Sequence, residues 1–352
     1  MKLIAPVGRA RALALAALAL LGLAALLLGG CGGGGSSASP VTSVSVRYYY
    51  VSDSGVLPIA ATVGDRVQLL AAGNTASGDQ EQLTDGVTWH STNAAVAAVD
   101  AGAWLTAKSP GTTEISLSWS TFTSPTLKVT VSAAGPTPTA TYYPFVAGNQ
   151  WVYTGTEVAP ASAAAATTLT IIAADQVVLE GLVWWELQIN YTDGTTGTMY
   201  LRHDATGLRE VDYQTSGSST VPLYTYRLQA PFTAGQHWTD PADPAVHYWD
   251  LQATAATVTV PAGTYHNCLQ VREHDVTTAG TAFYTTVWFA PAVGLVQTET
   301  DTIGTGGVLT LTQQQKLLSS KLAAAAALSA GRGAAAAGRS IRPWVGPALF
   351  RP

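Results

Sequence analysis

LTDGVTWHSTNAAVAAVD, at residues 83–100, is the stretch of sequence that decides the fold of the first half of the chain. It holds two short runs typical of β-strands, 87–89 and 95–99, and a turn-forming Asp-Gly pair comes just before the first of them. Runs of the same kind recur on both sides, at 41–46, 66–70, 113–117 and 127–131. About seven short strands in about 90 residues predict a two-sheet β-sandwich for residues 41–133.

Several residues of this stretch and its flanks fit a known family pattern. Residues 87–99 match V-x-W-x-S-x-N-x-x-V-A-x-V, and Gly64 and Gly111 come just before strand-like runs on either side of it. In this pattern the unit resembles the bacterial Ig-like group 2 family. The resemblance implies an Ig-like β-sandwich with Trp89 as its core tryptophan. It also implies a role as an extracytoplasmic spacer or adhesion module without a specific ligand.

The first thirty residues have the features of a secretory signal peptide. Three basic residues, Lys2, Arg9 and Arg11, precede the run 12–28, which contains only Ala, Leu and Gly. This run is at the short limit for a transmembrane helix, so an uncleaved anchor helix is the alternative. We predict that residues 1–30 are removed on export.

The tetrapeptide LGGC at residues 28–31 ends the apolar segment. It resembles the lipobox of bacterial lipoproteins, and the resemblance implies cleavage before Cys31 and lipid attachment to its thiol. Several acyl chains on one residue hold a protein stably on a membrane. Gly32 rather than Asp follows Cys31, which in that family implies the outer membrane, so we predict a lipid-anchored protein of the cell envelope. Residues 31–40 then form a flexible Gly- and Ser-rich tether.

The charge and cysteine content of the chain exclude some classes of partner and fold. The sequence has 17 basic and 22 acidic residues and a net charge of −5, and loss of the signal peptide makes the mature chain more acidic. A net-negative body argues against a nucleic-acid partner. With Cys31 taken by lipid, Cys268 has no partner for a disulfide, and we predict that it is a small buried hydrophobic residue.

A polar linker containing Pro and Thr, at residues 134–140, separates this unit from the rest of the chain. Beyond it, strand-like runs recur at 169–172, 176–179, 183–189, 199–203, 254–260, 267–273, 285–290, 295–300 and 309–312. Without long amphipathic helices between them, these runs predict an antiparallel β meander or barrel-like domain over residues 141–315, so the fold class is all-β. We expect the two units to fold independently. Residues 316–352 are predicted to be an Ala-rich low-complexity tail, with a short helix over 313–328.

Fragments of the second unit resemble signatures of uncharacterised bacterial lipoprotein domains. They are YPFVAGNQWVY at 143–153, PFTAGQHW at 231–238, VPAGTYHNC at 260–268 and WFAPAVGLV at 288–296. The resemblance implies no chemistry. We interpret Trp151, Trp238 and Trp288 as core anchors, two of which follow glycine-containing tight turns, and the Pro-Ala-Gly segment as a hairpin turn.

Polar residues are densest at 237–250, where two His and three Asp are potential metal ligands. Prolines interrupt their spacing, so we predict a solvated loop and no metal site. The sequence has no Gly-x-Ser-x-Gly elbow, phosphate-binding glycine loop or His-Glu-x-x-His motif. We therefore predict no catalytic residues and no cofactor, and that the protein is not an enzyme.

Three functions remain open from the sequence. The first is a non-enzymatic, membrane-anchored adhesion or spacer module that contacts an extracellular protein or glycan. The second is a glycan- or lipid-binding protein with a cavity in the 141–315 unit, lined by Trp184, Trp185, Tyr200 and Trp249. The third is a hydrolase that uses carboxylates brought together in space, drawn from Glu180, Glu186, Asp193 and Asp204.

Overall fold

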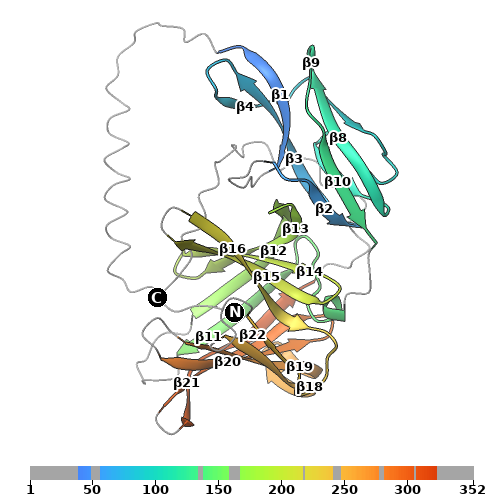
Figure 1. Cartoon of the computed structure of the whole chain (residues 1–352). Coiled ribbons are helices and arrows are strands. Elements are labelled where there is room, and N and C mark those ends of the chain that lie inside the picture. Colours follow the sequence, from blue (N-terminus) through green and yellow to red (C-terminus); the bar gives the residue numbers. More distant parts are fainter. Residues whose placement is uncertain are drawn as a thin grey trace, which may run out of the picture.

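The computed structural model is built almost wholly of β-strands, which confirms the predicted fold class (Figure 1). It describes residues 39–48, 56–133, 138–157, 167–216, 219–240, 247–276, 281–304 and 307–322. A short 3-10 helix, Pro138–Thr141, lies between the two β-rich units. No helix in these residues is long and apolar enough to cross a membrane. The predicted signal peptide, Cys31, and most of the predicted tether, linker and tail lie outside the described residues.

The first unit is a sandwich of two sheets. Its strands are β1 (Val41–Tyr48), β2 (Ile59–Thr62), β3 (Arg66–Thr75), β4 (Gln80–Gln82), β5 (Val87–Ser91), β6 (Ala97–Val99), β7 (Trp104–Ala107), β8 (Gly111–Trp119), β9 (Phe122–Thr123) and β10 (Leu127–Ser132). In one sheet β1, β4 and β7 pair with β3, and β6 pairs with β7. In the other, β10 pairs with β2 and β8, and β5 and β9 pair with β8. Side chains from both sheets form one apolar core.

Aliphatic residues fill the centre of this core. Leu69 and Leu105 come from one sheet and Ile115 and Leu117 from the other, and all four are almost completely buried. Trp89 differs from the prediction, because it is only partly buried and packs against the core from its margin. The reason is that β5 pairs, among the described strands, with β8 alone. Its tryptophan therefore covers an edge of the sandwich.

The second unit is one long antiparallel meander. Its strands are β11 (Gln150–Glu157), β12 (Thr167–Leu179), β13 (Leu182–Tyr191), β14 (Thr196–His203), β15 (Gly207–Ser216), β16 (Ser219–Gln229), β17 (His237–Thr239), β18 (Tyr248–Val260), β19 (Gly263–Val276), β20 (Ala282–Ala290), β21 (Gly294–Ile303) and β22 (Leu309–Lys321). The paired order runs β16-β15-β14-β13-β12-β11-β22-β21-β20-β19-β18-β17. The last strand thus pairs with the first and joins two sequential runs of strands into one curved sheet (Figure 1).

β22 corrects the prediction for the C-terminal part of the chain. Residues 313–321 are part of a strand, and not the start of a helix or a tail. Gln, Lys and Leu favour helices in isolation. Here, however, the segment pairs with β11 on one side and with β21 on the other. Two rows of inter-strand hydrogen bonds outweigh the weak helical preference.

The predicted anchors join distant fragments of the second unit. Trp151 Nε1 donates a hydrogen bond to Val293 O at 2.6 Å, and the Tyr153 hydroxyl donates to Leu295 O at 2.8 Å. Trp151 is therefore an anchor, as predicted, and Trp238 is likewise buried. Trp288 is only partly buried, because its two neighbours in β20 take the inward positions of the strand.

The predicted turns and the buried cysteine are present. Gly148 and Gly235 have φ angles of 87° and 83°, values that glycine adopts readily. β18 and β19 meet in a hairpin that pairs Val260 with Gly263. Cys268 is completely buried, and burial raises the pKa of its thiol. These local features followed directly from turn-forming and apolar residue types.

A hairpin of the second unit reaches into the first. Val178 and Val183, near the tip of the β12–β13 hairpin, pack within the apolar core of the first unit. At the tip, Gly181 O accepts a hydrogen bond from Ala60 N at 2.7 Å. The two units therefore share part of one core, in addition to being joined through the linker.

Polar contacts fix the same hairpin to the turn between β2 and β3. The Gln176 side chain accepts a hydrogen bond from Arg66 N at 2.7 Å and donates one to Asp65 Oδ1 at 2.8 Å. Burial raises the pKa of Asp65, which is enclosed at this joint. Because apolar and polar contacts both cross the boundary, we replace the expectation of independent folding with one of cooperative unfolding.

Candidate functional site

Charged side chains gather inside the second unit, where β15, β16 and β19 approach one another. Arg227 on β16 donates through Nη1 to both carboxylate oxygens of Glu273 on β19, at 3.0 and 3.1 Å. Its Nε donates to Glu210 on β15. All three side chains are largely buried, so a charge that lost its partner here would be strongly destabilising. We call these residues, together with His247 and Asp240, the charged core.

His247 connects the charged core to the start of β18. Its Nδ1 lies 3.1 Å from Asp240 Oδ2, and its Nε2 lies 2.8 Å from Glu273 Oε1. The ring also packs on Trp249, with centroids 4.3 Å apart. The prediction of a solvated loop over 237–250 is therefore wrong at both described ends, which form β17 and β18. Residues two apart in an extended segment point the same way, which turns His247 inward with Trp249.

The charged core links the two ends of the meander. Burial by itself lowers the pKa of an arginine, but Glu210 and Glu273 outweigh it and raise the pKa of Arg227 above its ordinary value. Arg227 therefore keeps its charge and holds β16 against β19. A second contact in the same place is the hydrogen bond from Trp238 Nε1 to Tyr226 O, at 2.8 Å.

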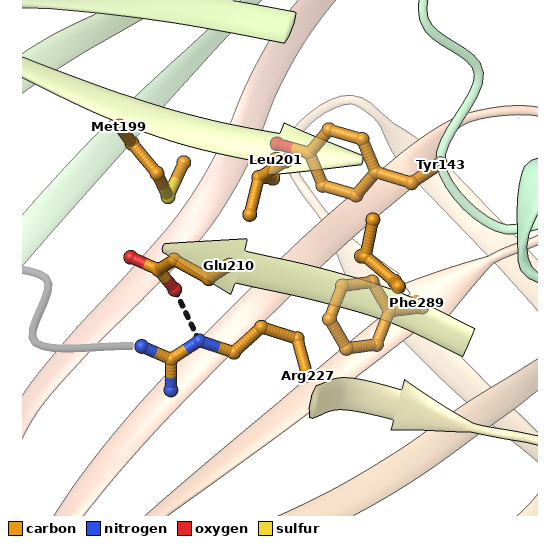
Figure 2. Close-up of a pocket in the computed structure, with 7 residues that line it drawn as sticks. Tyr143, Met199, Leu201, Glu210, Arg227 and Phe289 are labelled. Carbon is orange, nitrogen blue, oxygen red and sulfur yellow. Dashed lines mark hydrogen bonds and ion pairs between the residues drawn. The ribbon is translucent and has the colours of Figure 1, made fainter. Parts of the chain in front are cut away.

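Figure 2 shows a small cavity beside the charged core. It is lined by Tyr143, Met199, Leu201, Leu208, Glu210, Arg227 and Phe289. Its volume of about 10 Å³ has room for about one water molecule and for no larger ligand. The Tyr143 hydroxyl is buried and has no hydrogen-bond partner within the described residues, so a water between it and Glu210 would satisfy it. The charged core is thus suited to holding the sheet together, and the cavity beside it has no room for a substrate.

The four aromatic residues predicted to line a cavity do not surround one space. Trp184 and Tyr200 lie together in a small apolar cluster. Trp185 instead packs against Phe145, with ring centroids 5.9 Å apart, and Trp249 lies in the main core. Neighbouring residues in a strand point to opposite faces, and this separates Trp184 from Trp185.

The carboxylates considered for hydrolysis occupy separate places in the fold. Asp193 accepts hydrogen bonds from Thr195 N and Oγ1, at 2.9 and 2.6 Å. Asp204 accepts two from backbone N–H groups, at 2.8 Å each. Both close turns between strands, while Glu180 lies between β12 and β13 and Glu186 is buried within β13. In the described part of the chain, no group of three or more His, Cys, Asp or Glu is placed to hold a metal ion.

A cluster that the sequence analysis missed lies on the face of β13–β16 opposite the main core. Arg202 and Arg209 are direct cross-strand partners. Their guanidinium carbons lie 5.5 Å from the ring centroid of Trp184 and 4.9 Å from that of Tyr224, respectively. The two rings stack on each other at 5.8 Å. We call these four residues the arginine–tryptophan cluster. The turn at 205–207, midway between the two arginines, was the signal that could have placed them opposite each other.

A histidine beside the linker has a contact at each of its two ring nitrogens. His203 Nε2 lies 2.8 Å from Tyr143 O, and its Nδ1 lies 2.7 Å from Thr139 Oγ1. A neutral ring satisfies both, since it donates to the carbonyl and accepts from the hydroxyl. Burial lowers the pKa of His203 to about 4.

We expect the free energy of unfolding to fall as the pH drops from 6.5 to about 4. Over this interval the unfolded chain takes up a proton at His203 that the folded chain does not, whereas above it both forms are neutral and the full stability is present. The shift corresponds to about 3 kcal/mol. Urea unfolding at pH 7 and pH 4 measures the loss, and His203→Gln should reduce it by this amount. Equal losses in both proteins would contradict the assignment.

Comparisons with known proteins give distant structural matches. No family model and no curated protein matches the chain. It is similar to a candidate lipoprotein from Parabacteroides distasonis (16% identity, TM-score 0.34, 51% of this chain and 98% of the other). It is also similar to a candidate exported protein from Bacteroides fragilis with a YmcC-like fold (14%, 0.34, 51% and 99%). Domains 4–9 of the surface layer protein SbsC match at 12% identity and a TM-score of 0.24, over 75% of this chain and 31% of the other. No family is assigned to the chain on these similarities.

Proposed function

We propose that the chain is a lipid-anchored protein of the bacterial cell envelope that acts as a rigid, non-catalytic display module. The first unit is a spacer of the bacterial Ig-like group 2 type, and the second unit contacts an extracellular protein or glycan. The lipobox at 28–31 and the apolar run before it support anchoring through Cys31, at the outer membrane.

The shared core at the β12–β13 hairpin is the observation that carries this proposal. A spacer can present a second module in a fixed direction only if the two modules do not rotate freely. Val178 and Val183 are 1% and 4% exposed, and both belong to the core of the first unit. The two units then move as one arm on a nine-residue tether, 32–40, whose r.m.s. reach is roughly 15–18 Å.

The interior of the second unit supports contact with a partner through the outer surface. The cavity beside the charged core has a volume of about 10 Å³, which is too small for a sugar ring or an acyl chain. The aromatic residues considered for a ligand cavity are split between two faces of the sheet. As part of this proposal, we assign contact with a protein or glycan to exposed strands.

Cys31→Ser is expected to release the protein from the membrane fraction. The change removes the thiol to which the lipid is attached, so the acyl chains that hold the protein at the bilayer are lost. Fractionation of cells, with mass spectrometry of the mature N-terminus, measures both effects. Cys268→Ser is the matched control, because that thiol is buried in the fold and should leave fractionation unchanged. A wild-type protein that is water-soluble and begins at another residue would refute the proposal.

A further inference from the structure

Four N–H donors of the arginine–tryptophan cluster are buried without an acceptor. They are Nε1 of Trp184, Nε and Nη1 of Arg202, and Nε of Arg209, and none has a hydrogen-bond partner within the residues that the structure describes. Trp184 is completely buried. Buried donors are nearly always paired, because an unpaired one loses the hydrogen bond that it had with water. A site with several such donors and no acceptor is complementary to a group rich in acceptors.

The charges of the cluster point to the same kind of partner. Arg202 in β14 and Arg209 in β15 are directly opposite each other, and like charges in such positions destabilise a sheet. Their stacking on the rings of Trp184 and Tyr224 holds both guanidinium groups in place. The cluster therefore holds two positive charges in fixed positions, and an anion bound between them would reduce their mutual repulsion.

The two carboxylates nearest in charge to Arg202 are not hydrogen-bonded to these four donors, and a third, Glu180, acts on Tyr224 of the same cluster. Asp65 and Asp204 are the acids whose charges act on Arg202. Asp65 already accepts hydrogen bonds from a backbone N–H and from the Gln176 amide. Asp204 Oδ1 accepts hydrogen bonds from two backbone N–H groups. Asp204 Oδ2 lies 3.6 Å from Nη1 of Arg209, and Nε of Arg209 has no hydrogen-bond partner within the described residues.

We propose that the arginine–tryptophan cluster binds a phosphate-type oxyanion. This goes beyond the display role, which needs no ligand at this face. A planar carboxylate matches the fork of a single guanidinium, whereas the oxygens of a tetrahedral oxyanion point in several directions and can accept from side chains on three strands. Arginine suits such a site better than lysine, because its planar donors hold a fixed direction. The phosphate can belong to a free ion or to the headgroup of a lipid.

Titration of the purified mature chain, in detergent, with inorganic phosphate tests the site. We expect saturable binding by calorimetry, and a rise of the thermal midpoint with phosphate that is larger in the wild type than in the arginine variants, since phosphate also stabilises proteins non-specifically. Arg202→Gln and Arg209→Gln should each weaken binding at least tenfold. Trp184→Phe keeps the ring but removes the indole N–H, and should weaken it severalfold. Arg272→Gln is the matched control, since that guanidinium also stacks on a ring, that of Tyr284 at 5.2 Å, and should leave binding unchanged.

Vesicles of phosphatidylcholine with and without phosphatidylglycerol identify the source of the phosphate. The site is assigned to a lipid headgroup if the protein binds the anionic vesicles, if inorganic phosphate displaces it from them, and if Arg202→Gln weakens this binding. Binding of inorganic phosphate alone assigns it to a free ion. A phosphate response no larger than that of chloride, or one retained in full by both arginine variants, overturns the proposal. Because the calorimetric titration measures an affinity of the folded protein, a variant that merely shifts the starting stability does not mimic loss of the site.

Discussion

Replacing Arg227 with leucine is expected to lower the free energy of unfolding by about 3–5 kcal/mol. The change leaves Glu210 and Glu273 in the interior without the guanidinium group that now pairs with both. Leucine retains much of the apolar stem of arginine, so the loss reports mainly on charge. Urea unfolding at pH 7 measures it. Tryptophan fluorescence is a suitable signal, because Trp249 packs on His247 of the charged core.

Arg272→Leu is the matched control for this prediction. Arg272 belongs to β19, the strand that carries Glu273, but its guanidinium carbon lies 5.2 Å from the ring of Tyr284 and outside the charged core. A partly exposed cation of this kind contributes about 1 kcal/mol or less. If the two leucine variants lost the same stability, the charged core would contribute no more than a surface arginine, and our interpretation of it would fail.

Gly181→Ala is expected to separate the unfolding of the two units. Gly181 has a φ of 73°, and a Cβ at this position would lie 2.6 Å from Pro58 O in the first unit. The strained backbone and the close approach together cost about 2–3 kcal/mol, which the hairpin can relieve by withdrawing from the shared core. Differential scanning calorimetry should show one cooperative transition for the wild type and two for the variant.

Gly194→Ala separates backbone strain from contact between the units. Gly194 also has a positive φ, of 85°, in the turn between β13 and β14, but a Cβ there would meet no atom within 4 Å. The control should therefore lose about 1 kcal/mol and keep a single transition. Two transitions in the wild type itself would mean that the hairpin does not couple the units.

Most strands could be predicted, because local residue patterns specify them. β10 alternates buried and exposed residues along its whole length, and the same alternation is visible in its sequence. Turns with glycine divide such strands at the predicted places, for example at Gly148 and Gly235. In these cases neighbouring residues determine whether a segment forms a strand or a turn, so a single sequence is enough to predict it.

The charged core and the arginine–tryptophan cluster could not be predicted in the same way. Glu210, Arg227 and Glu273 lie on three different strands, and only the order and register of those strands bring them together. The grouping of Trp184 with Trp185 failed for a related reason, since adjacency in sequence means opposite faces in a strand. β22 was misread because pairing on both sides overrode its local preference.

If the chain is exported as we propose, the pairing of β22 with β11 also bears on how it crosses the membrane. Residue 150 finds its partner in residue 321, so the contact that closes the second unit is among the most distant in the chain. Contacts between distant residues form slowly. A polypeptide that enters a translocation channel from its N-terminus delivers β11 early and β22 last, and the sheet stays open until nearly all strands have passed. On the proposed export, this topology would leave the sheet open until translocation is nearly complete. During that delay the edges of β11 and β21 are unprotected, and a periplasmic chaperone that covers them would prevent aggregation.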